Sequence, residues 1–519
     1  MMVDGSAITP GDGTKWTILL LAYWHELLSG LLIIYVISLL WKAFDLLYLH
    51  PLASVPGPRL AAITSLYGFY YNYIRDGTYS KQFAELHKKY DSPVIRVAPN
   101  RVHVNDVEFY ETVFRAGAPF YKEPEFYKSL GADGALASLT DPAVHRKHRS
   151  YLSSLFSAQT TLDLKPRLLE TLKKAAGHLQ TAAANDKSVD IQKIYSELIG
   201  DVVCDLMFAH SYNFIDSGDD GHPLLNEVDN LGSITWLMME FPAIKTVMKA
   251  LPSSVGNKLS PEIIRFRQFC DDRLAEAQHR KLSGNVPARK SYFDLYLEID
   301  SRKNSLPNVA EVFDGAFNFM TAGIHTTAYT LSWATFNILN SPSVLAKVQS
   351  ELDGAKAAIR DVFDPKAIQN LPYLGGVIRE TMRLADPVPG YLPRVVPKEG
   401  IQVGLFFLPG GTSVSTSHPV IHMDPTIFPE PNKFDPERWI RGGEELERYS
   451  VPFGKGSRRC IGMSVAYMEL YAVLAYIFSH FALELVDDDQ SRNGIQWADR
   501  IVARATSDLK IKVRKDLWA

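Results

Sequence analysis

The stretch Phe453-Gly454-Lys455-Gly456-Ser457-Arg458-Arg459-Cys460-Ile461-Gly462 decides how this 519-residue sequence is interpreted. Its three glycines predict a tight, irregular turn, because glycine adopts backbone conformations that other residues avoid. A cysteine lies in the turn, two arginines precede it, and a helical pattern follows from Val465 to Phe478. Cationic neighbours and the start of a helix both favour a thiolate over a thiol. The loop therefore predicts that Cys460 is a nucleophile or a metal ligand.

The surroundings of Cys460 separate these two roles. A thiolate nucleophile usually needs a general base, and the loop contains no histidine. One thiolate cannot hold zinc alone. It can be the only protein ligand of a haem iron, because the porphyrin supplies four nitrogens. The other two cysteines, Cys204 and Cys270, lie within helical patterns, where packing is their default role.

The pattern F-x-x-G-x-R-x-C-x-G, filled by Phe453, Gly456, Arg458, Cys460 and Gly462, resembles the haem loop of the cytochrome P450 family. The resemblance implies haem b with Cys460 as the axial thiolate ligand of the iron, and contacts to the haem from the other four residues. It also implies a monooxygenase with a mostly α-helical fold and small β-sheets. The resemblance extends over nearly the whole chain. The sequence is most similar in kind to fungal microsomal members of the family that act in secondary metabolism.

The composition suits a folded protein and limits its partners. Hydrophobic residues make up 46% of the chain and charged residues 22%, which excludes a disordered or low-complexity protein. Lys and Arg total 55 against 58 Asp and Glu, so there is no basic excess for binding nucleic acid. Three widely spaced cysteines form no disulfide framework and indicate a reducing compartment.

Residues 16–41 form an apolar run long enough to cross a membrane, which requires about 20 residues. A cleaved signal peptide and a buried core helix are the alternatives, but the start of the chain is not basic. Residues 1–15 carry a net charge of -1 and residues 42–59 one of +1, which places the body in the cytosol. We therefore expect a lumenal tail (1–15), an endoplasmic reticulum membrane anchor (16–41), a hinge with Val55-Pro56-Gly57-Pro58 (42–58) and one catalytic domain (59–519).

The body shows mainly helical periodicity and has no internal linker. Helices are expected at 141–156, 191–209, 261–281, 309–340, 342–358 and 372–385, several of them starting at a proline. Strands are expected at 94–97, 101–104, 412–416 and 509–513.

Glu380 and Arg383 lie one turn apart on a predicted helix and can form an ion pair. Such a pair is usually a surface feature. The family resemblance implies instead that Glu380, Arg383 and Arg438 form a buried triad that supports the thiolate loop and has no catalytic role.

The long predicted helix 309–340 contains Ala322-Gly323-Ile324-His325-Thr326-Thr327. Glycine and a back-bonding threonine bend helices, so this is either a packing notch or a groove for a ligand. The resemblance implies an oxygen-activation site of Gly323, His325 and Thr326, in which Thr326 relays protons. His325 stands where the family has an acid, and it can either shuttle protons or face away.

Cations are expected near the two haem propionates. His145 and Arg149 share one helix face, and the resemblance implies that they bind propionates together with Arg394 and Arg458. The alternative for residues 145–149 is a solvated basic stripe. Arg146, Lys147, Lys455 and Arg459 are candidates for docking an acidic electron donor.

No dinucleotide-binding fingerprint is present, so the resemblance implies electrons from NADPH through a separate flavin-containing cytochrome P450 reductase, with cytochrome b5 as a further donor. Segments 120–139, 230–251, 317–320 and 388–392 are apolar and are expected to line a pocket for a lipophilic terpenoid or polyketide-like substrate. The 230–251 stretch can equally pack in the core or touch the membrane. Two further functions stay open: a haem-thiolate isomerase or dehydratase without net use of dioxygen, and a non-catalytic haem protein that binds a ligand.

Overall fold

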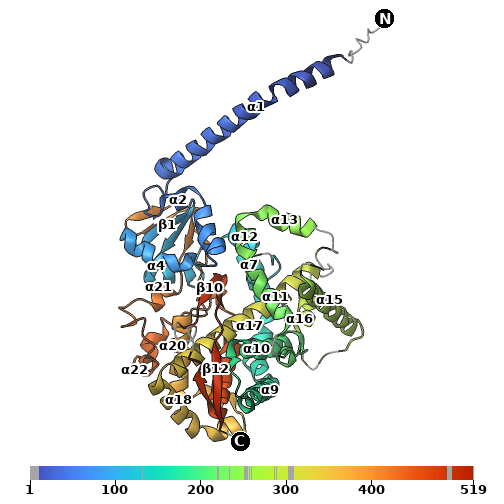
Figure 1. The fold of residues 1–519 in the computed structure, drawn as a ribbon, viewed down its shortest axis with the longest axis vertical. Helices are drawn as coiled ribbons and strands as arrows, with labels where there is room; N and C mark the ends of the chain where they lie inside the picture. Colours follow the sequence, from blue (N-terminus) through green and yellow to red (C-terminus); the bar gives the residue numbers. More distant parts are fainter. Residues whose placement is uncertain are drawn as a thin grey trace.

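Helices form most of the molecule, and four small sheets form the rest, as the sequence predicts (Figure 1). The structure is a computed structural model and describes residues 11–130, 132–218, 221–232, 234–250, 255, 258, 260–285, 287, 289–301, 309–487 and 494–517. The first ten residues of the predicted lumenal tail therefore lie outside the described residues.

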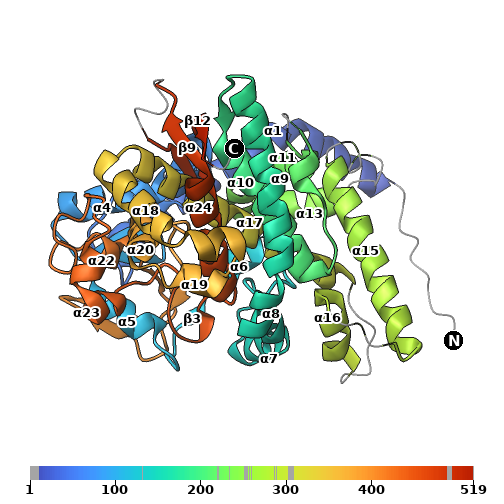
Figure 2. The same ribbon diagram turned by 90° about the horizontal axis from the view of Figure 1, so that it is seen from below.

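Four helices form the centre of the body: α10 (Ile191–Phe208), α17 (Val309–Leu339), α20 (Pro372–Ala385) and α24 (Met463–His480). α17 packs against each of the other three. Figure 2 shows α17 in the middle of the body, with α18 (Pro342–Gly354) and α20 on one side and α15 (Pro261–Leu282) and α16 (Tyr292–Ser301) on the other. α24 is apolar on nearly all sides and is almost fully buried, as expected for a core helix.

The remaining helices surround this centre. They are α2 (Arg59–Ile63), α3 (Leu66–Phe69), α4 (Tyr79–Tyr90), α5 (Val107–Phe114), α6 (Pro124–Ser129), α7 (Pro142–Leu152), α8 (Ala158–Asp163), α9 (Lys165–Ala184), α11 (Pro223–Gly232), α12 (Ile234–Glu240), α13 (Pro242–Ala250), α19 (Pro365–Gln369), α21 (Pro419–His422), α22 (Arg438–Arg441) and α23 (Gly443–Glu447). Two predicted helices are too long. Residues 342–358 contain α18, which ends at Gly354 and is followed by a separate π-turn at Ala357–Asp361. Residues 141–156 contain α7, which ends at Leu152 and is followed by a 3₁₀ turn at Ser153–Phe156.

The largest sheet has the strand order β1-β2-β8-β5-β3. Its strands are β1 (Val94–Ala98), β2 (Arg101–Val104), β3 (Tyr121–Lys122), β5 (Arg394–Val395) and β8 (Ser413–Ser415). β2 and β8 run parallel, and the other neighbours are antiparallel. A second sheet has the order β4-β12-β9, with β4 at Val189–Asp190, β12 at Lys510–Asp516 and β9 at Phe481–Leu485. One hairpin is formed by β6 (Ile401–Val403) and β7 (Phe406–Leu408). Another is formed by β10 (Trp497–Arg500) and β11 (Val502–Ala505). All four predicted strands are present, within three residues at each end.

α1 (Gly11–Phe44) projects from the body and is followed by a π-turn at Asp45–Leu49 (Figure 1). In the described part of the chain, the segment apolar and long enough to cross a membrane is Glu26–Leu49, and it overlaps the predicted anchor 16–41. The apolar character continues past Trp41 because Phe44, Leu46, Leu47 and Leu49 follow it.

The predicted hinge is held against the body. Arg96 of β1 is buried and donates from Nη1 to the carbonyl of Leu46 at 2.7 Å. The Arg96 N–H donates to the carbonyl of Pro56 at 2.7 Å. A Cβ on Gly57 would lie 2.3 Å from the Arg96 carbonyl oxygen, so only glycine permits this approach. The segment therefore forms a fixed joint between α1 and β1.

Candidate active site

The thiolate loop folds as the sequence predicts. The Cys460 N–H donates to the carbonyl of Phe453 at 2.9 Å, which closes the turn, and α24 begins directly afterwards at Met463. Gly456 has a φ of +66°, and a Cβ there would lie 2.1 Å from the carbonyl oxygen of Phe114. Gly456 therefore lets the loop dock on the end of α5, and it shapes the loop without lining the cavity described next.

A cavity of about 370 Å³, which we call the Cys460 cavity, lies between the thiolate loop and α17. Nine of the predicted site residues line it: Gly323, Thr326, His145, Arg149, Arg394, Phe453, Arg458, Cys460 and Gly462. They come from α7, α17, β5 and the loop, which are far apart in the sequence. The volume lies within the roughly 300–1,000 Å³ usual for ligand pockets.

The Cys460 thiol does not have the lowered pKa that the sequence suggested. Burial raises its pKa, and this outweighs the lowering by the Gly462 N–H, Arg149 and Arg459. The side chain is exposed and lines the Cys460 cavity. Because a thiol that coordinates a metal is deprotonated, with its proton released to water, the protein would not need to form the thiolate in advance.

One end of the Cys460 cavity gathers cations. His145, Arg149, Arg394 and Arg458 meet there with Lys122, which the sequence analysis missed. Burial and the nearby Arg394 and Arg458 hold the pKa of Lys122 well below its usual range. Burial lowers the pKa of Arg458 to about 10 and that of His145 to about 3, and neighbouring cations add to both effects.

This cluster fits the two carboxylates of a haem. Several guanidinium N–H groups are already used: Arg149 donates to the carbonyl of Arg459 at 2.7 Å, Arg458 to that of Leu139 at 2.6 Å, and Arg394 to the Tyr127 hydroxyl at 2.8 Å. Among the described residues that line the cavity, the only carboxyl group is Glu469. The clustered positive charges therefore need an anionic ligand to offset their mutual repulsion.

The middle of α17 forms the opposite wall. The Thr326 hydroxyl lies on the cavity and donates to the carbonyl of Ala322 at 2.7 Å. A Cβ on Gly323 would lie 3.0 Å from Val203 of α10, so this glycine also serves as the packing notch considered above. Both functions suggested by the sequence therefore coexist at this turn.

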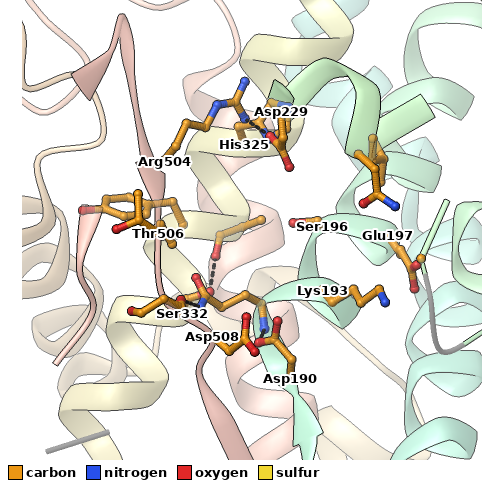
Figure 3. Close-up of a pocket in the computed structure, with 18 of the residues that line it drawn as sticks. Asp190, Lys193, Ser196, Glu197, Asp229, His325, Ser332, Arg504, Thr506 and Asp508 are labelled. Carbon is orange, nitrogen blue, oxygen red and sulfur yellow. Dashed lines mark hydrogen bonds and ion pairs between the residues drawn. The ribbon is translucent and has the colours of Figure 1, made fainter. Parts of the chain in front are cut away.

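His325 does not line the Cys460 cavity. It lies in a second, polar cavity of about 430 Å³ between α10, α11, α17 and β11, which we call the His325 cavity. Figure 3 shows His325 beside Asp229 and Arg504, and its Nδ1 lies 3.5 Å from Asp229 Oδ1. One residue along a helix rotates a side chain by roughly 100°, which separates His325 from Thr326. Of the two orientations left open by the sequence, His325 has the one that faces away.

Glu380 is the centre of a buried polar network outside both cavities. It accepts bonds from Arg383 (Nη2, 2.8 Å; Nε, 3.0 Å) and from Arg438 Nε (3.0 Å). Trp439 Nε1 and the Asp435 N–H complete the set at 2.9 and 3.1 Å. The predicted triad is thus assembled and is extended by Trp439, whose indole was not predicted as a partner.

Apolar side chains form the rest of the Cys460 cavity. Three of the four predicted segments contribute to it, through Leu136, Phe319 and Val388 among others. Of the fourth segment, 230–251, none of the described residues lines this cavity, which favours the alternative that it packs in the core or touches the membrane. Trp236 packs in the core and donates to the carbonyl of Asp499 at 2.7 Å, whereas Phe241 and Val247 are exposed. In their place α10 supplies Val203, Leu206 and Met207.

Comparisons with known proteins agree with this geometry. The family model for cytochrome P450 matches residues 56–513. The chain is 46% identical to cytochrome P450 monooxygenase phqM of Penicillium fellutanum, over 90% of this chain and 88% of that protein. It is 38% identical to cytochrome P450 monooxygenase ankB of Aspergillus thermomutatus (95% and 94% covered) and 36% identical to cytochrome P450 monooxygenase cloA of Claviceps purpurea (97% of both).

Proposed function

This chain belongs to the cytochrome P450 family of haem-thiolate monooxygenases, and we propose that it oxidises a lipophilic small molecule of secondary metabolism at the endoplasmic reticulum membrane. Dioxygen would be the oxidant, and a separate NADPH-dependent reductase would supply the electrons. The observation that carries this proposal is the single cavity that joins Cys460, the cation cluster, Thr326 and apolar walls. A lipophilic substrate, terpenoid or polyketide-like, is supported by the apolar walls of the cavity.

The residues of the Cys460 cavity would have different roles in the reaction. Haem with a thiolate ligand supplies the reductive activation of dioxygen and the transfer of one oxygen atom to a substrate. Cys460 would hold the iron, and Lys122, His145, Arg149, Arg394 and Arg458 would hold the propionates. Thr326 would carry a proton at Oγ1, on the wall opposite Cys460.

Labelled dioxygen tests the reaction class. The full chain, together with a reductase and NADPH, should transfer label from dioxygen into the product of a lipophilic substrate. Thr326→Ala should release peroxide at the expense of product. Thr330→Ala is the matched control, because Thr330 is also back-bonded, to the carbonyl of Thr326 at 2.8 Å, and lies outside the cavity. A product without label would instead indicate the isomerase or dehydratase.

Membrane attachment would use more than α1. α2 lies at the end of the body from which α1 leaves (Figure 1), and its Leu60 is exposed. Ile74, at the end of the π-turn that follows α3, is also exposed. Phe69 contacts Phe241 of the α12–α13 connection with ring centroids 5.4 Å apart, so the exposed Val247 belongs to the same surface. Apolar patches of this kind suit a lipid surface. We propose that this surface rests on the cytosolic face of the membrane.

The reductase would dock near the thiolate loop. Arg146, Lys147 and Arg459 are exposed there, whereas Lys455 forms an ion pair with Glu111 and is a weaker candidate. Complementary charge mainly raises the association rate. Arg146→Glu combined with Lys147→Glu should slow electron transfer from the reductase at low salt and have little effect at high salt. Cytochrome b5, as an acidic partner, would use the same surface.

A further inference from the structure

Glu469 is a buried acid that the mechanism above leaves unused. It lies on α24, is 1% exposed, and lines the Cys460 cavity. Its Oε1 has no hydrogen-bond partner among the described residues, and the Thr327 side chain, next to Thr326 on α17, is the polar neighbour that acts on the pKa of this carboxyl group. An ionised carboxylate is costly in such a place unless it is paired. Burial raises the pKa of Glu469 to about 8, and the Thr327 side chain lowers it only in part.

Charged groups on α17, α18 and α20, three of the elements that pack against α24, are engaged elsewhere. On α17, His325 faces the other cavity beside Asp229. On α18, Glu351 accepts the N–H groups of Tyr373 and Leu374, and on α20 Arg379 pairs with Glu447 while Glu380 holds the triad. The basic groups that line the Cys460 cavity are Lys122, Arg149, Arg394, Lys455, Arg458 and Arg459, together with the His145 imidazole. None of them is among the influences on the Glu469 pKa. Burial therefore decides its protonation state.

We propose that Glu469 is a proton-coupled positioning residue, a carboxylic acid that stays neutral at physiological pH and ties electron delivery into the Cys460 cavity to the presence of one proton. This inference rests on the proposed function, because it requires a reducible haem in that cavity. Negative charge that enters a low-dielectric site favours the protonated form of a neighbouring acid.

The coupling has a defined balance. Below the pKa of Glu469 the proton is already bound, so one electron arrives from the reductase and no proton is taken up. Above it, the carboxylate of Glu469 takes one proton from water as the electron arrives. The reduction potential should therefore be constant below that pKa and fall above it, by one proton per electron, until the pKa of the reduced state is passed.

The test is a redox titration of the full-length haem protein on both sides of pH 8. The wild type should show the break near the pKa of Glu469, and Glu469→Gln should give a potential that does not change with pH. Glu447→Gln is the matched control, because Glu447 is a partly exposed acid paired with Arg379, and it should keep the break. An unchanged break in Glu469→Gln would overturn the proposal.

A second measurement does not depend on the variant. The infrared spectrum of the wild type should contain the carbonyl stretch of a protonated, buried carboxylic acid below about pH 8 and lose it above, with a shift when the haem is reduced. Absence of this band below pH 8 would contradict the proposal even if Glu469→Gln fails to fold. A carbon monoxide difference spectrum of the same sample reports thiolate ligation. A normal carbon monoxide spectrum together with a reduction potential that shows no pH break would overturn only the Glu469 inference. A chain that binds no haem would overturn the proposed function as well.

Discussion

At the residue scale, Glu380 is the centre of a buried network of charged side chains. It is fully buried between Arg383 and Arg438, which are 2% and 6% exposed. Removing one member of such a network leaves buried charges without compensation, at a cost of about 3–5 kcal/mol. Glu380→Ala should therefore lower the yield of folded, haem-containing protein and shift the urea midpoint down by a corresponding amount.

A surface pair of the same chemistry gives the control for this prediction. Glu447 lies 2.7 Å from Arg379 Nε and both side chains are well solvated. Exposed ion pairs contribute about 0–1 kcal/mol. Glu447→Ala should leave the urea midpoint nearly unchanged. Equal effects of the two variants would show that burial does not set the value of the triad.

The site residues that could be predicted from the sequence are those that belong to a short local motif. Cys460, Arg458 and Gly462 share one loop, and Glu380 and Arg383 share one helix turn. Lys122 and Glu469 were missed because they reach the cavity from elements whose packing no local pattern encodes. A charged residue inside the otherwise apolar run 465–478 was the one available signal for Glu469. The orientation of His325 also needed the structure, since two adjacent positions on a helix face different neighbours.

At the scale of elements, a glycine sets how closely α20 approaches the segment that delivers Arg438. A Cβ on Gly376 would lie 2.5 Å from the carbonyl oxygen of Pro436. Because backbone is hard to displace, Gly376→Ala should push this segment away from Glu380 and destabilise the protein by about 1–3 kcal/mol, as overpacking does. Urea denaturation measures the effect.

Gly177 provides the opposite case within a helix. It lies in α9, and a Cβ there would meet nothing within 4 Å. Gly177→Ala should raise stability by about 0.5–1 kcal/mol, since alanine loses less backbone entropy in a helix. If Gly376→Ala also stabilised the protein, the close packing of α20 would not be the reason for its glycine.

Element boundaries were predictable where caps and prolines mark them. α20 spans the predicted residues 372–385, and α10, α15 and α17 differ from prediction by one residue at one end. Periodicity could not assign the partner of an apolar face, which is why segment 230–251 was placed at the pocket. Its described residues divide between core contacts, through Trp236, and exposed positions, through Phe241 and Val247.

At the scale of the whole molecule, buried acids should make stability fall as the pH rises above neutrality. Burial raises the pKa of Glu197 to about 7 and that of Glu469 to about 8, from 4.5 in the unfolded chain. Between these values the folded state holds protons that the unfolded state has lost, so stability decreases with pH by at most roughly 1.4 kcal/mol per unit for each group.

Buried histidines make stability fall as the pH drops, and they set the lower limit of the pH range in which the effect of the acids can be measured. Burial lowers the pKa of His480 to about 3 from 6.5, so below 6.5 the unfolded state binds more protons and stability falls as the pH drops. The effect of the acids should therefore be seen between about pH 6.5 and pH 8. Urea midpoints across this window should decline for the wild type and decline less for Glu197→Gln. A rising midpoint would contradict the raised pKa values.

The joint between α1 and the body sets where the chain can be shortened. Arg96 is 2% exposed and donates to the carbonyls of Leu46 and Leu52 and to His50 Nδ1, at 2.7, 3.4 and 3.3 Å. A protein lacking residues 1–41 keeps these partners, so it should dissolve more readily than the full chain and keep its urea midpoint. A protein lacking residues 1–58 removes both partners of Arg96 Nη1, the carbonyls of Leu46 and Leu52, whereas Nε and Nη2 keep the carbonyl of Pro99. Leaving this one donor group without its partners should cost about 1–3 kcal/mol. Sedimentation from membranes and urea denaturation of both shortened proteins, each loaded with haem, measure the two effects. Equal midpoints would mean that the segment around Pro56 is a free linker, and failure of the shorter deletion to leave the membrane would locate lipid contacts on the body itself.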